Sequence, residues 1–165
     1  GGRDMTRILL YNGELDFLTR GYMAAHSGYS YSSTDEILGH LVQNAPSGGF
    51  GVVELVFHSG VPGQVTLLDA DCVGGFTAAS PVGMVSHSSG MENFWRTLGQ
   101  YIRPGGVLSL NACSIAEGRA GGHLLRHLCR AIGGGKRVCG GLGDQTSGVF
   151  EYNNASLMRG YPYYF

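Results

Sequence analysis

Charged side chains are scarce in this chain of 165 residues, and their signs nearly cancel. Asp, Glu, Lys and Arg make up 14% of the sequence, and the formal net charge is −1 at pH 7. A protein that binds nucleic acid or an acidic membrane surface usually concentrates positive charge on one face. The composition therefore argues against both of these partners.

Long apolar runs are also missing. No stretch approaches the ~20 apolar residues that a membrane-spanning helix requires, and no secretory signal peptide is visible. We therefore expect no membrane insertion. A cytoplasmic location is favoured, and export as part of a larger protein stays open because Gly1-Gly2 could be a cloning or processing remnant. The sequence gives no indication of the oligomeric state.

Cysteine is infrequent, and its spacing fits neither a zinc site nor a dense disulfide framework. No two cysteines have the Cys-x-x-Cys spacing, so reduced thiols are expected. The four are Cys72, Cys113, Cys129 and Cys139.

Glycine, in contrast, is abundant, with 29 residues and no collagen-like period, which indicates many tight loops around a sheet. Apolar strand-like runs alternate with stretches of helical period. This alternation predicts one α/β domain over residues 1–165, a three-layer α/β/α sandwich with a mostly parallel sheet. The core covers 6–148, and an aromatic extension, 149–165, adds a strand or two at the sheet edge. Strands are predicted at 6–12, 52–57, 64–68, 107–110 and 136–139, helices after Ser33, after Ser89 and over 124–132, and a loop at 27–33.

Two of the predicted strands lead to residues that can form a nucleophilic pair. The strand 107–110 leads to Cys113, and the strand 52–57 leads to His58. Neighbouring parallel strands end at the same edge of a sheet, where open α/β sheets bind ligands. A helix starting after Cys113 favours the thiolate, and an imidazole beside it supplies a base. Each residue alone is more typical of a buried side chain, but the two strand ends together favour a Cys–His site.

The residues around both positions resemble the caspase-like (clan CD) cysteine peptidases. The segment Leu108-Ser-Leu-Asn-Ala-Cys113 is similar to their strand ending in Ala-Cys, and Phe57-His-Ser-Gly60 to their strand end at His-Gly. The His–Cys spacing of 55 residues is close to the ~50 of caspases. Here Ser59 stands between the histidine and the glycine, which are adjacent in most of the family.

The order of elements extends this resemblance over residues 6–148. A His strand, a hairpin, a helix, a Cys strand, a helix, a further strand and Asp144-Gln-Thr-Ser-Gly148 follow one another. This order is closest to a caspase-like domain of large bacterial surface and repeat proteins. The resemblance implies a caspase-like fold and peptide-bond hydrolysis without a cofactor, on a peptide or protein substrate.

Catalytic roles follow from the resemblance by position. Cys113 is the expected nucleophile, and His58 is the expected general base and acid. The backbone N–H of Cys113, with that of Ser59 or Gly60, is expected to polarise the scissile carbonyl. No carboxylate is placed by the sequence to orient His58.

Substrate-binding roles are implied in the same way for Asn12, Asn111 and Asp144. None of these positions is Arg or Lys, so the carboxylate of an acidic substrate residue would be desolvated without a cation. Asp144 adds a negative charge, which predicts cleavage after Arg or Lys. The irregular segment 69–89 is predicted to form an active-site loop or lid, and it holds His87, the next candidate base.

Two readings from other classes stay open. One is a catalytically silent caspase-like module that binds a partner or serves as a structural unit. The other keeps the Cys–His pair but makes it an acyltransferase or amidase acting on a small substrate. The intact pair favours an enzyme.

Overall fold

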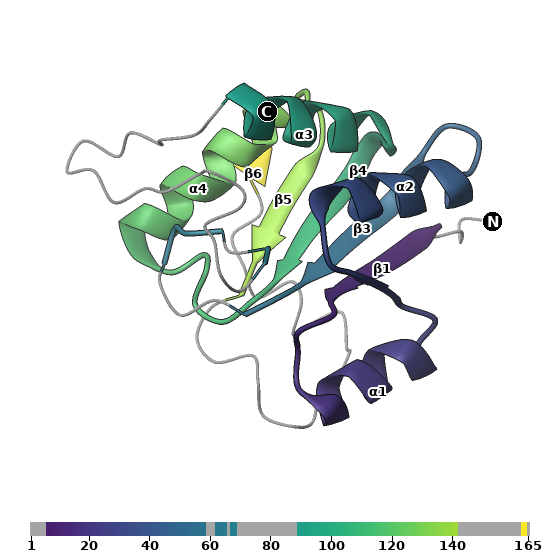
Figure 1. Ribbon diagram of the computed structural model, residues 1–165. Coiled ribbons are helices and arrows are strands. Elements are labelled where there is room, and N and C mark those ends of the chain that lie inside the picture. Colours follow the sequence, from purple (N-terminus) through teal and green to yellow (C-terminus); the bar gives the residue numbers. More distant parts are fainter. Residues whose placement is uncertain (1–5, 59–61, 66, 69–88, 142–162, 165) are drawn as a thin grey trace.

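The computed structural model describes residues 6–58, 62–65, 67–68, 89–141 and 163–164. Its centre is a sheet of six strands in the order β2-β1-β3-β4-β5-β6 (Figure 1). The first five strands are parallel, and β6 pairs antiparallel with β5 at one edge. The strands are β1 Arg7–Asn12, β2 Tyr29–Tyr31, β3 Phe50–Val56, β4 Ile102–Asn111, β5 Arg137–Gly140 and β6 Tyr163–Tyr164. The helices are α1 Phe17–Ala25, α2 Thr34–Asn44, α3 Ser89–Gln100 and α4 Gly118–Ala131.

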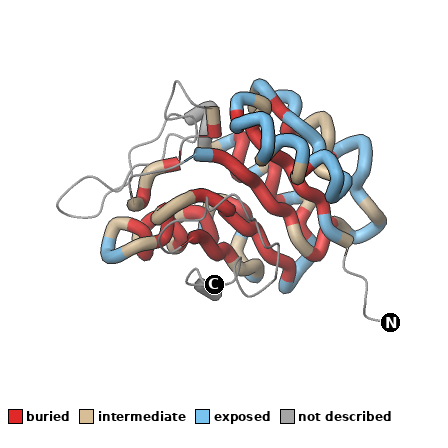
Figure 2. The backbone as a smooth tube through the Cα atoms, turned by 90° about the horizontal axis from the view of Figure 1, so that it is seen from below, coloured by how far each residue is buried: buried red, intermediate tan, exposed pale blue. Residues whose placement is uncertain are grey.

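Helices cover both faces of this sheet. The predicted α/β class and mostly parallel sheet are therefore confirmed. Helices α2, α3 and α4 pack on one face, around the fully buried Trp95, and α1 packs on the other around Met23. Figure 1 shows α1 alone on its side of the strands. Figure 2 shows buried residues concentrated along the strands and exposed ones on the outer helices and turns. Among the described residues, no helix has both the length and the apolar character needed to cross a membrane.

Strands with continuous apolar runs lie where the sequence predicts them, and so does the helix α2, which Ser33 caps. The Ser33 hydroxyl accepts the N–H of Glu36 at 3.1 Å and starts α2. The aromatic tail contributes an edge strand, as predicted, at Tyr163–Tyr164. The predicted return strand at 64–68 is wrong, because Gln64 and Leu68 make only isolated bridges.

Two further predictions are wrong for identifiable reasons. The loop predicted at 27–33 contains β2, a strand too short to show alternation. The strand predicted at 107–110 is longer than expected, because β4 begins at Ile102 and contains Pro104. The ladder between β3 and β4 shifts register between Phe50 and Val52, which accommodates the extra residues beside the proline as a bulge.

The strand order places a topological switch between β1 and β3. The chain leaves β1 toward β2 on one side, and β3, β4 and β5 follow on the other. In open parallel sheets a crevice for ligands forms at the carboxyl ends of the strands that flank such a switch. Residues that follow β1 and β3 at this edge are therefore the first candidates for a site.

Candidate active site

The ends of β3 and β4 bring His58 and Cys113 to neighbouring positions. In the parallel ladder Val56 pairs with Asn111, and His58 and Cys113 each lie two residues farther along. The Phe57 N–H donates to the Asn111 carbonyl at 3.3 Å and extends the pairing past the last strand residue. His58 is exposed and Cys113 is partly exposed. The sheet thus presents a thiol and an imidazole on adjacent strand ends at its carboxyl edge.

The turn after Cys113 is tightly determined by backbone contacts. The Ala112 N–H donates to the Leu110 carbonyl at 3.1 Å, which bends the chain away from the sheet. Ser114 then takes a left-handed backbone conformation, with φ of 56°. Such a conformation costs a non-glycine residue on the order of 1 kcal/mol, and it recurs at functional sites. Ile115 and Ala116, which follow Ser114, are fully buried. These two residues anchor the turn in the core while Cys113 stays at the surface.

The segment that follows His58 is joined to this turn. The Gly63 N–H donates to the Ile115 carbonyl at 2.9 Å, and Gly63 has φ of 79°. A Cβ atom on Gly63 would lie 2.7 Å from the Ala120 carbonyl oxygen. Only glycine allows the loop after His58 to approach α4 this closely, so the His58 side of the site is packed against the elements that follow Cys113.

A carboxylate that the sequence does not single out lies within electrostatic reach of His58. Asp16 follows β1 at the same edge and caps α1, accepting the Thr19 N–H at 3.0 Å and the Thr19 hydroxyl at 3.1 Å. These bonds hold the pKa of Asp16 below its usual value, and the charges of His58 and Arg20 act in the same direction. Asp16 is thus a helix cap and also the acidic neighbour of the candidate base.

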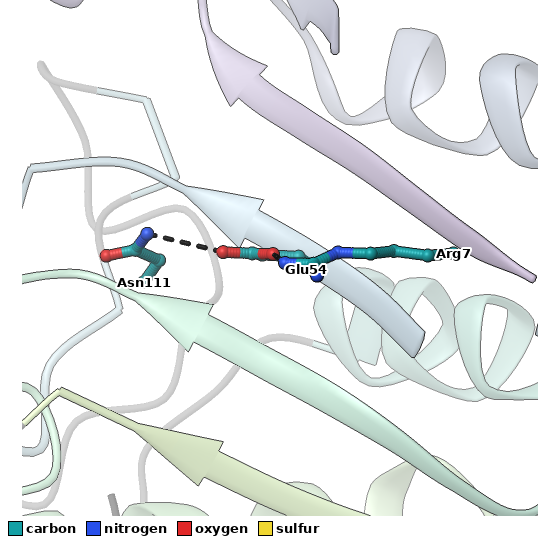
Figure 3. A network of polar contacts seen from close by, with 3 residues as sticks. All are labelled: Arg7, Glu54 and Asn111. Carbon is teal, nitrogen blue, oxygen red and sulfur yellow. Dashed lines mark hydrogen bonds and ion pairs between the residues drawn. The ribbon is translucent and has the colours of Figure 1, made fainter. Parts of the chain in front are cut away.

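The two asparagines predicted to bind substrate are both buried at this edge. The Asn12 Oδ1 atom accepts the Glu14 N–H at 2.9 Å, so this amide shapes the turn after β1. Asn111 is 4% exposed and donates from Nδ2 to the Glu54 Oε2 atom at 3.3 Å. Glu54 is fully buried and forms an ion pair with Arg7 (Figure 3). A lone acidic residue inside the apolar run of β3 is the sequence signal for this network, because a buried carboxylate requires a partner.

The described thiols differ sharply in their environments. Cys129 and Cys139 are fully buried, and burial raises the pKa of both to about 11. Cys113 is the partly exposed thiol among the three described. No group of three or more His, Cys, Asp or Glu side chains in the described part of the chain is arranged to hold a metal ion.

Several predicted site residues lie outside the described residues. They are Ser59 and Gly60, proposed for the oxyanion site, the substrate-binding Asp144, and His87 within the predicted lid. Their roles stay predictions.

Comparison of the chain with models of known protein families, with curated proteins and with solved structures gave no match in any of the three. The function is therefore inferred from the residues and their arrangement.

Proposed function

We propose that this chain is a caspase-like cysteine endopeptidase with Cys113 as nucleophile and His58 as general base and acid. The observation that carries the proposal is the register of β3 and β4, which puts both residues two positions beyond a paired strand end. The order β3, α3, β4, α4, β5 also follows the order that the family resemblance predicts, apart from the return strand of the hairpin after β3. No cofactor is needed for this chemistry.

The reaction proceeds in two stages. His58 accepts the proton of the Cys113 thiol, and the sulfur attacks the scissile carbonyl carbon. Backbone N–H groups at the strand ends stabilise the oxyanion of the tetrahedral intermediate. His58 then donates the proton to the leaving amine, and an acyl-enzyme remains on Cys113. Water, deprotonated by His58, hydrolyses the thioester and restores the thiol.

Selective labelling of Cys113 tests the proposal. A peptidyl acyloxymethyl ketone should add once per chain, on Cys113, because a thiol with a pKa of about 11 has very little thiolate at pH 7. Mass-spectrometric mapping should find Cys129 and Cys139 unmodified. Cys72→Ala should label at the wild-type rate and Cys113→Ala should not label. An adduct confined to Cys72 would contradict the assignment.

Asp16 provides a separate test of the charge near His58. Asn caps helices about as well as Asp, so Asp16→Asn removes the charge and keeps the cap. We expect Asp16→Ala to lower the free energy of unfolding by about 1 kcal/mol, and Asp16→Asn by a few tenths. Both should lower kcat by at most about fivefold, with KM unchanged, because exposed charge pairs contribute up to about 1 kcal/mol.

The stability term depends on pH. Folding lowers the pKa of Asp16, so its contribution is complete above the pKa of an unfolded aspartate, about 3.9. It is lost as the pH falls through the folded value. Urea unfolding across this range and steady-state kinetics give the two readouts. Loss of activity in the alanine variant alone would show that the position of α1, rather than the charge, matters.

A further inference from the structure

A line of polar side chains crosses the α1 face of the sheet from its amino edge to its carboxyl edge. Glu54 stands in the centre, in register with Leu9 of β1 and Ser109 of β4. Arg7 lies two residues before Leu9, and Asn111 lies two residues after Ser109. The three polar side chains therefore run diagonally over three strands, and Asn111 is the one that reaches the edge where Cys113 lies (Figure 3).

Glu54 determines which way the Asn111 amide faces. A carboxylate has acceptor atoms and no donor, so only the NH2 group of an amide can face it. The Nδ2 atom of Asn111 does so at 3.3 Å from Oε2. Arg7 forms an ion pair with the fully buried Glu54. This ion pair offsets part of the cost of burying the charged carboxylate. The opposite end of the amide, Oδ1, then has to point away from Glu54.

The Oδ1 atom of Asn111 is buried and has no hydrogen-bond partner among the described residues. Figure 3 shows it on the far side of the amide from Glu54, toward the ends of the strands. A buried acceptor without a donor is costly, and buried polar groups in native proteins are almost always paired. A side chain held in one orientation with its acceptor unpaired is therefore suited to receive a donor from a ligand.

We propose that Arg7 and Glu54 are positioning residues that make Asn111 an obligatory acceptor, and that Asn111 Oδ1 binds a hydrogen-bond donor of the substrate. The donor is the amide, ammonium or guanidinium end of the side chain before the cleaved bond. This inference rests on the peptidase function proposed above and narrows its substrate class. A carboxylate at the same place would set acceptor against acceptor and is disfavoured.

Isosteric probes test this directly. Three peptidyl acyloxymethyl ketones should differ only in the residue next to the warhead: glutamine, norleucine or glutamate. Intact-mass kinetics of Cys113 labelling should rank glutamine over norleucine over glutamate, with at least tenfold between the first and the last. Glutamine and glutamate have nearly the same shape, so the ratio reports donor against acceptor.

Variants assign the selectivity to the positioning pair. Glu54→Gln replaces the acceptor-only group by an amide that also donates. The side-chain amide of Asn111 can then flip and present its NH2 group to the substrate. We expect the glutamine-to-glutamate ratio to fall toward one. Ser109→Ala, beside Glu54 on the same face, is the matched control and should keep the wild-type ratio. If Glu54→Gln fails to fold, the wild-type ranking still decides.

The outcomes separate this inference from the peptidase proposal. Labelling of Cys113 at equal rates by all three probes, or fastest with glutamate, overturns the inference. The peptidase proposal is unaffected by this result. No labelling by any probe overturns the peptidase. In that event the Asn111 side-chain NH2 signal in a nitrogen-15 NMR spectrum decides whether Asn111 accepts a donor at all: a shift with propionamide and none with propionate supports this part of the inference, and no shift with propionamide overturns it.

Discussion

Replacing either Cys113 or His58 by alanine should lower kcat for peptide hydrolysis by about 10⁴-fold or more. In the proposed mechanism the thiol supplies the bond-forming atom and the imidazole moves the proton in both directions, so neither would work alone. Catalytic residues that act as a unit are strongly non-additive. The double variant should therefore be no slower than either single variant.

Controls decide whether such losses are catalytic. His58 is exposed and Cys113 partly exposed, so both alanine variants should unfold within about 1 kcal/mol of wild type, as surface substitutions do. His40→Ala, on α2, removes an imidazole that contacts the Ser30 carbonyl and should retain full kcat. Full activity in His58→Ala would move the role of base to His87.

The second large effect is expected at Gly121, where α4 meets the turn after Cys113. A Cβ atom there would lie 2.1 Å from the carbonyl carbon of Ala116, far inside contact distance. Both groups are backbone and cannot rotate away, so α4 or the turn has to shift. We expect Gly121→Ala to lower the free energy of unfolding by about 3 kcal/mol, at the upper end of overpacking costs.

Gly39→Ala is the matched control. Gly39 also lies inside a helix, α2, but a Cβ atom there meets nothing within 4 Å. Alanine at such a position stabilises a helix by about 0.5–1 kcal/mol. Denaturant unfolding should thus give opposite signs for the same chemical change. Hydrolysis should be lost in Gly121→Ala under conditions where the variant is folded, because the turn that presents Cys113 is displaced. Equal stability of the two variants would show that this packing is wrong.

The strand ends that carry the candidate pair were predictable because β3 and β4 are buried on both faces. Their apolar runs carry a strong signal, and a candidate residue close after each run, His58 or Cys113, is visible without any structure. The helix α1 had no such signal. Of its residues only Met23 is buried, and Phe17 and Leu18 at its start are 80% and 76% exposed. Apolar side chains that face solvent hide the helical period.

Asp16 was missed because its position depends on this helix and on long-range strand pairing. Its approach to His58 depends on where α1 begins and on the pairing of β1 with β3, and neither follows from local sequence. The Asp-x-x-Thr pattern indicates a helix cap and nothing about the neighbour across the sheet edge. Glu54 was visible as a charge within an apolar strand, but its partners Arg7 and Asn111 are 47 and 57 positions away in sequence. Long-range register, rather than propensity, selects them.

The parallel order of β1 to β5 has a consequence for how the chain acquires this site. No two of these strands form a hairpin, and β3 pairs with β4 only after the intervening segment has closed a long loop. The entropy of that closure is lost before the contacts that compensate it are made, which slows folding. During synthesis β3 presents an unpaired hydrogen-bonding edge until β4 has left the ribosome. The strand that leads to His58 is thus exposed on its lateral side to wrong partners, such as the same strand of another nascent chain.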